Sequence, residues 1–156
     1  MSGHTAAYAR AAVAWAVARV GEPYTPWRCL AFVEDAYERA NGIEVFGGAS
    51  ATESAAHYGT QLFDPEAPPP PGAFVFHRAS GPAGGVHRDW GHVGMALGDG
   101  RVVHALGRIR VDDARAVQTL TLGPGWSAPE LIGWTGPDRI LAGHRARDWS
   151  TALSDA

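Results

Sequence analysis

The sequence contains no lysine and only one cysteine among its 156 residues. All thirteen basic side chains are therefore arginines, and they are scattered along the chain. With a net charge of −3, the composition gives no reason to expect nucleic acid or an anionic membrane as a partner. A single cysteine excludes a disulfide within the chain, so Cys29 is a free thiol whose presence needs another explanation.

Long apolar runs are also absent. No run approaches the roughly 18 apolar residues that a membrane-spanning helix needs. Near the start of the chain Arg10 and Arg19 interrupt the apolar stretch, which is not the pattern of a signal peptide. We therefore expect the protein to stay inside the cell, or to be exported by a route without an ordinary leader.

Metal-binding motifs are missing as well, although the chain has seven histidines. The sequence has no His-Glu-x-x-His motif and no pair of cysteines, so we expect neither a metal nor another cofactor. His77 and His87 have a different possible role, because they lie where they could line a cleft.

The predicted elements place helices first and strands afterwards. Apolar periodicity predicts helices over 5–20, 25–40 and 52–58. Thr25 is predicted as the N-cap of the second helix, with Pro26 at its first position. The predicted strands are 73–78, 92–97, 101–106, 116–122 and 130–135, with a glycine-rich loop over 79–91.

This order indicates an α+β fold in which N-terminal helices pack on a central antiparallel sheet. We assign residues 1–136 to one domain. Residues 137–156 are rich in arginine and weakly patterned, so we expect them to form a C-terminal surface segment.

Cys29 falls in the first turn of the second predicted helix. Free backbone N–H groups and the helix dipole favour an anion there, so this position predicts a lowered thiol pKa. A lone cysteine is nevertheless more often a small buried hydrophobic side chain than a nucleophile.

A predicted hairpin brings two histidines together. If Gly98-Asp99-Gly100 forms a three-residue turn with Gly100 in the left-handed conformation, Leu97 pairs with Arg101. Gly94 then lies opposite His104, and His92 shares a face of the sheet with His104 as a diagonal neighbour. The simpler interpretation is two histidines making local hydrogen bonds in a half-buried hairpin. Together with Cys29, they could instead form a nucleophile, a base and a group that orients the base.

These features resemble a known family over roughly residues 6–135. The motifs are Gly21-Glu22-Pro23-Tyr24, Cys29 followed by Phe32-Val33, the run 71–76, and His92-Val93-Gly94 with His104 after it. They are similar to those of the NlpC-type cysteine peptidases, papain-like enzymes that cut the peptide stems of bacterial cell walls. The resemblance implies that Cys29 is the nucleophile, His92 the base and His104 the orienting residue. It also implies that Tyr24 lies beside the nucleophile and helps to position substrate.

The chain departs from the family beside the nucleophile. The family has Asp-Cys-Ser-Gly, whereas this chain has Arg28-Cys29-Leu30-Ala31. Arg28 reverses the local charge and favours a carboxylate-bearing group over an ammonium group. Trp27 and Trp90 flank the nucleophile and the base, so we expect them to shape an apolar or aromatic substrate subsite.

The resemblance therefore implies a bacterial cysteine endopeptidase. It would cleave an amide or isopeptide bond, with a peptidoglycan stem peptide as the expected substrate, through a Cys-His-His triad and a thioester acyl-enzyme. Three alternatives stay open: an acyltransferase or amidase acting on a small peptide or natural product, a catalytically idle binding module, and an exported lytic enzyme.

Overall fold

The computed structural model describes residues 2–25 and 28–150. The helices are α1 (Gly3–Val17), α2 (Cys29–Asn41), α3 (Ala51–Tyr58) and α4 (Pro137–Leu141), with a 3-10 helix η1 over Ala116–Thr119. The strands are β1 (Ile43–Glu44), β2 (Phe74–Arg78), β3 (Ser80–Ala83), β4 (Val86–Asp89), β5 (His92–Ala96), β6 (Arg101–Leu106), β7 (Arg108–Asp113), β8 (Glu130–Thr135) and β9 (Arg145–Ala146).

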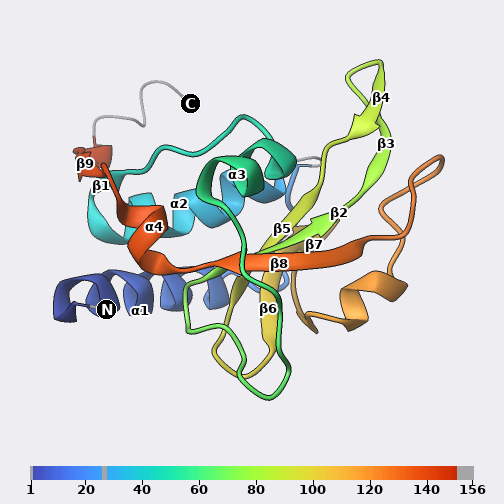
Figure 1. Cartoon of the computed structure of the whole chain (residues 1–156). Helices are drawn as coiled ribbons and strands as arrows, with labels where there is room; N and C mark the ends of the chain where they lie inside the picture. The colour runs from blue at the N-terminus through green and yellow to red at the C-terminus, as the bar shows by residue number, and fades with distance from the viewer. Residues whose placement is uncertain (1, 26–27, 151–156) are drawn as a thin grey trace.

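The central sheet is antiparallel, with its strands in the order β7-β6-β5-β2-β8. Figure 1 shows α1 and α2 packed beside this sheet, and the β3–β4 hairpin projecting from it at the upper right. The predicted α+β arrangement of helices on an antiparallel sheet is confirmed. In the described parts of the chain, no helix is both long and apolar enough to cross a membrane.

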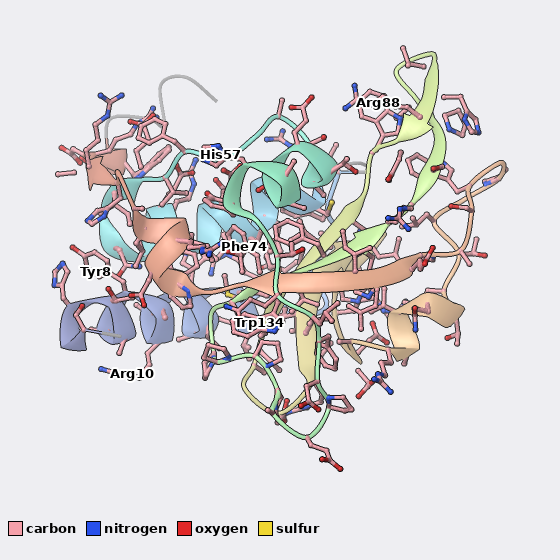
Figure 2. All side chains as sticks on the ribbon, in the orientation of Figure 1. Tyr8, Arg10, His57, Phe74, Arg88 and Trp134 are labelled. Atoms are coloured by element: carbon pink, nitrogen blue, oxygen red, sulfur yellow. The ribbon has the colours of Figure 1, made fainter. Side chains whose placement is uncertain are left out.

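The core lies between α2 and the sheet. Phe32 and Tyr37 on α2 are fully buried, as is Phe74 on β2, which Figure 2 labels where the helices meet the sheet. Tyr37 also satisfies its buried hydroxyl by donating a 2.7 Å hydrogen bond to the carbonyl of Gly72. The helical half carrying Cys29 and the strands carrying the histidines therefore share one core.

The predicted register of the β5–β6 hairpin is confirmed. Met95 pairs with Val103, and the backbone N–H of Leu97 donates to the carbonyl of Arg101 at 3.0 Å. Gly100 has the positive φ that the turn requires, 92°. A Cβ at Gly94 would lie only 3.1 Å from the Cβ of His104, so glycine leaves room there for the imidazole.

The start of the second helix differs from the prediction. α2 begins at Cys29, with Arg28 as an N-cap that makes no side-chain capping hydrogen bond. Thr25 is therefore not the cap, and Pro26 lies outside the described residues. Cys29 consequently sits at the first helical residue, where its own N–H is among the free donors of the helix start.

Two stretches of the sheet region were also wrongly predicted. The stretch 79–91, expected to be a loop, contains the β3–β4 hairpin, and 116–122, expected to be a strand, contains η1. The strand that follows β6 is β7, in which the apolar residues Ile109 and Val111 alternate with charged residues. Ile109 is buried.

The segment after residue 136 is not confined to the surface, contrary to the expectation for 137–156. Ile140 and Leu141 of α4 are buried in the same core as α1, while β9 pairs with β1. Arg145 and Ala146 of β9 are exposed, and residues 151–156 lie outside the described part of the chain.

Candidate active site

A cavity of about 530 Å³ lies where the start of α2 meets the start of β5. Cys29 and His92 both line it, together with the predicted substrate residues Arg28 and Trp90. The volume is in the range of sites that bind small molecules or peptide segments. The fold therefore brings four of the predicted residues to one cavity.

Tyr24 is not part of this grouping. Tyr24 is absent from the cavity lining and instead packs edge-on against Phe32, with ring centroids 5.3 Å apart. Burial and the nearby carboxylate of Asp35 raise the pKa of Tyr24 to about 12, so its hydroxyl stays protonated. Trp27 lies outside the described residues.

The thiol of Cys29 is partly buried at the start of α2. Burial raises its pKa above the ordinary value, although the backbone N–H groups of Val93, Leu30 and Cys29 act in the opposite direction. The prediction of a lowered thiol pKa is therefore wrong, because desolvation outweighs the donors of the helix start. The resting thiol is neutral at neutral pH.

His92 and His104 form a buried, hydrogen-bonded pair on one face of the β5–β6 hairpin. Nε2 of His92 lies 2.8 Å from Nδ1 of His104, and the two side chains are 3% and 0% exposed. Burial, His104 and His77 hold the pKa of His92 well below its usual value of 6.5. Since Nε2 is occupied by His104, Nδ1 is the ring nitrogen of His92 that remains available to the thiol.

The histidine pair is hydrogen-bonded to Asp112, a residue that was not predicted from the sequence. Nε2 of His104 lies 2.7 Å from Oδ2 of Asp112, and Arg110 donates to both oxygens of that carboxylate at 2.7 and 3.1 Å. Burial tends to raise the pKa of Asp112, but the hydrogen bonds from Arg110 and His104 outweigh it and hold the pKa below its usual value. Arg110 and Asp112 are two residues apart and share a face of β7, but this spacing points to them only once 108–113 is known to be a strand.

His77 lies behind this pair and does not line the cavity. Its ring is 6.3 Å from that of His92, and Nε2 donates to the carbonyl of Ala114 at 2.8 Å. Burial lowers the pKa of His77 to about 4, so it is neutral. His87 does not line the cavity either, and its side chain is exposed on β4.

The cavity walls are largely apolar. The apolar side chains that line it include Leu30, Trp90, Leu106, Leu122, Pro124 and Trp126. Arg28 lines the cavity as an exposed cation, while burial, with the nearby Glu38 and Asp35, raises the pKa of Glu34 in the lining to about 8. Among the described residues, the cavity lining thus includes the cation of Arg28 and the mostly protonated carboxyl of Glu34.

The β3–β4 hairpin helps to build the cavity. The indole N–H of Trp90 donates to the carbonyls of Gly81 and Val86 at 3.1 and 3.2 Å, which fixes this lining residue to the hairpin. Arg88, labelled on the hairpin in Figure 2, stacks on Trp90 at 4.2 Å and pairs with Glu53 of α3 at 3.3 Å.

Among residues 2–25 and 28–150, no three or more His, Cys, Asp and Glu side chains are grouped so that they could hold a metal ion. The chemistry that the cavity can support with its own residues is that of a thiol beside a buried, neutral imidazole pair. Such an arrangement can transfer a proton from sulfur to nitrogen as the sulfur attacks an electrophile.

The chain is similar to known proteins in its sequence and in its fold. The sequence model of the NlpC/P60 family matches residues 21–121, a span that contains Cys29, both histidines of the pair and Asp112. Among solved structures, NlpC1 from Trichomonas vaginalis is similar with a TM-score of 0.50 and 21% identity. That similarity covers 83% of this chain and 45% of the other, so this chain spans less than half of that protein's length. No curated protein matches the sequence.

The similarity to NlpC1 supports the papain-like α+β fold, and the family match covers well over half of the chain. Members of that family are typically cysteine peptidases or amidases that act on peptide substrates. The chain belongs to the NlpC/P60 family of papain-like cysteine hydrolases.

Proposed function

We propose that the protein cleaves an amide or isopeptide bond, with Cys29 as nucleophile, His92 as base and His104 as the residue that orients the base. The observation that carries the proposal is the buried 2.8 Å contact between His92 and His104 beside a cavity that Cys29 lines. A base held by a hydrogen bond next to a nucleophile is the arrangement that acyl transfer requires.

In the proposed reaction, the thiol proton moves to Nδ1 of His92 as sulfur attacks the substrate carbonyl carbon. The resulting oxyanion accepts a hydrogen bond from the backbone N–H of Cys29, which has no partner within α2. His92 then gives its proton to the leaving nitrogen, the C–N bond breaks, and a thioester remains. Water, losing a proton to His92, attacks the thioester, which releases the carboxylic acid and restores the thiol.

A peptidoglycan stem peptide is the first substrate to test, because the family acts on peptides. Arg28 and Trp90 line the cavity, so we assign substrate contacts to them. The guanidinium of Arg28 suits a carboxylate of the substrate, and Trp90 suits an apolar or aromatic group.

A second candidate is amide hydrolysis or acyl transfer on a small peptide or natural product. The largely apolar cavity favours it, since a strongly polar stem peptide would leave these walls unmatched. Conversely, retention of a thiol and a buried imidazole pair at one cavity argues against a binding module without catalysis.

The test is to incubate the protein with cell-wall fragments, with small apolar amides and with acceptor amines, and to identify products by mass spectrometry. Hydrolysis products with a transient mass increase on Cys29 support the proposal. Both should vanish in the Cys29→Ala and His92→Ala variants and persist in His57→Ala, whose exposed histidine lies outside the cavity. Products that survive in Cys29→Ala would overturn the assignment.

A further inference from the structure

The hydrogen-bonded histidine pair ends on an ion pair formed within a single strand. His104 is fully buried, and its Nε2 contacts Oδ2 of Asp112, the same oxygen that accepts a hydrogen bond from Nε of Arg110. A surface ion pair between residues two apart on a strand needs no third partner. The 2.7 Å contact with a buried imidazole therefore links Asp112 to the site.

The positions of the protons along these hydrogen bonds can be worked out starting from Asp112. Two hydrogen bonds from Arg110 keep the carboxylate of Asp112 ionised, and an ionised carboxylate can only accept. Nε2 of His104 must therefore carry a proton, and in a neutral imidazole Nδ1 is then an acceptor. Since Nδ1 of His104 faces Nε2 of His92, that Nε2 must donate, which leaves Nδ1 of His92 unprotonated.

We propose that Asp112 is a positioning residue that fixes the tautomers of His104 and His92, so that the unprotonated Nδ1 of His92 is the atom left free for the thiol of Cys29. Its importance for catalysis rests on the proposed function, whereas the tautomers themselves do not. The opposite tautomer of His92 would place a proton where the base must accept one, and the pair would be inactive as a base.

Asp112 also supplies a negative charge that stabilises His92 when His92 is protonated. When His92 takes a proton, a cation forms where burial disfavours it, and the neighbouring His77 and His104 are both neutral. Asp112 is the anion in contact with the pair, and it acts on His92 through His104. Arg110 moderates this charge but holds the carboxylate in place with two hydrogen bonds.

The tautomers can be measured without a substrate. In long-range ¹H–¹⁵N NMR spectra of protein labelled at histidine nitrogens, protonated and unprotonated ring nitrogens are distinguished directly. We expect both His92 and His104 to carry the proton on Nε2 at neutral pH. A proton on Nδ1 of either residue in the unaltered protein would overturn the proposal, and this result is independent of whether the protein hydrolyses any amide.

The second measurement replaces the carboxylate. In Asp112→Ala we expect the ring nitrogens of His104 to average between tautomers, and alkylation of Cys29 at pH 7 to slow at least tenfold. Asp112→Glu, which keeps an acceptor, should recover part of the rate. Asp113→Asn is the matched control, because Asp113 accepts hydrogen bonds from the backbone of Arg115 and Ala116 instead.

The outcomes separate the two proposals. If Asp112→Ala keeps the original tautomers and an alkylation rate within twofold of the unaltered protein, Asp112 has no positioning role. If the tautomers are as expected but no amide is cleaved, the proposed function fails and the positioning role stands. If Asp112→Ala unfolds, the NMR spectrum of the unaltered protein still tests whether His92 and His104 have the expected tautomers.

Discussion

At the scale of single residues, Cys29 and His92 are tuned by burial more than by the helix start. Desolvation raises the pKa of the thiol and lowers that of the imidazole, so each favours its neutral form. These pKa directions favour a neutral thiol and a neutral imidazole at rest over a stored thiolate–imidazolium ion pair, so we expect the proposed base to act during the attack.

This resting state has a measurable pH dependence. Small alkylating reagents attack the thiolate, which here becomes abundant only above the ordinary thiol pKa of about 8.5. At pH 7 alkylation is slower and depends on His92 accepting the thiol proton as the reagent is attacked. We expect the alkylation rate of Cys29 by iodoacetamide to rise with pH and to reach half of its maximum above that value. Glutathione in the same buffers serves as the reference thiol. A plateau in the rate already reached below pH 7 would reveal a stored ion pair and contradict the prediction.

His77 offers a test of the buried histidines through stability. Its pKa is about 4 in the folded protein, against an ordinary histidine value of 6.5. A lowered folded pKa stabilises the fold above pH 6.5, and this contribution is lost as pH falls toward 4, because the unfolded chain takes up the proton first. We expect the unfolding free energy of the unaltered protein, relative to His77→Gln, to fall by about 2 kcal/mol between pH 7 and pH 5.

Urea unfolding of both proteins at the two pH values measures this difference. Glu34 has a raised pKa and contributes in the opposite direction, but it is present in both proteins and cancels. Equal differences at pH 7 and pH 5 would mean that His77 is not held neutral by the fold.

At the scale of elements, the β3–β4 hairpin controls one side of the cavity. A Cβ added to Gly81 would lie 2.2 Å from the ring of Trp126, so the ring must move. Because Trp126 lines the cavity, we expect Gly81→Ala to slow modification of Cys29 by a bulky aryl reagent several-fold while leaving iodoacetamide nearly unaffected. Rate constants for the two reagents, compared at one pH, measure this selectivity.

Gly84→Ala is the control in the same hairpin. A Cβ there meets nothing within 4 Å, although the positive φ of 57° makes the change cost about 1 kcal/mol of stability. If Gly84→Ala altered the ratio of the two rates as strongly as Gly81→Ala, the effect would come from hairpin strain and not from Trp126.

The two hairpins, β5–β6 and β3–β4, differ in how far the sequence predicts them. The β5–β6 register was predictable because one short glycine-containing turn fixes it, and with it the shared face of His92 and His104. The β3–β4 hairpin was not, because its glycines and proline disfavour strands locally and its pairing depends on contacts such as that of Trp90 with Gly81.

Asp112 was missed for a related reason. Its contact with His104 exists only because β7 pairs with β6 so that His104 faces Arg110. Without the strand, the sequence offers two adjacent acidic residues, Asp112 and Asp113, and no means to choose between them. Site residues supplied by one hairpin were therefore predictable, and those supplied by the next pairing were not.

At the scale of the whole molecule, the site lies across the interface of two layers. Cys29, the proposed nucleophile, comes from the helical layer and the two histidines come from the sheet, so their separation depends on packing between α2 and β5. Sequence periodicity predicts both layers, but the volume of the cavity between them results from many distant side chains at once.

The C-terminal segment contributes to that packing. Ile140 of α4 is fully buried in the core shared by α1, α2 and β5, although it follows the predicted domain boundary at residue 136. Truncating a buried isoleucine to alanine removes apolar contacts and leaves a cavity, which costs about 2–5 kcal/mol. We expect Ile140→Ala to lower the unfolding free energy by that amount, as measured by urea unfolding.

Leu62→Ala is the control, since Leu62 is 88% exposed and its truncation should change stability by less than about 0.5 kcal/mol. Equal stability of the two variants would place α4 outside the domain. A large loss in Ile140→Ala alone would instead make the segment after residue 136 part of the scaffold that holds Cys29 and the histidines at one cavity.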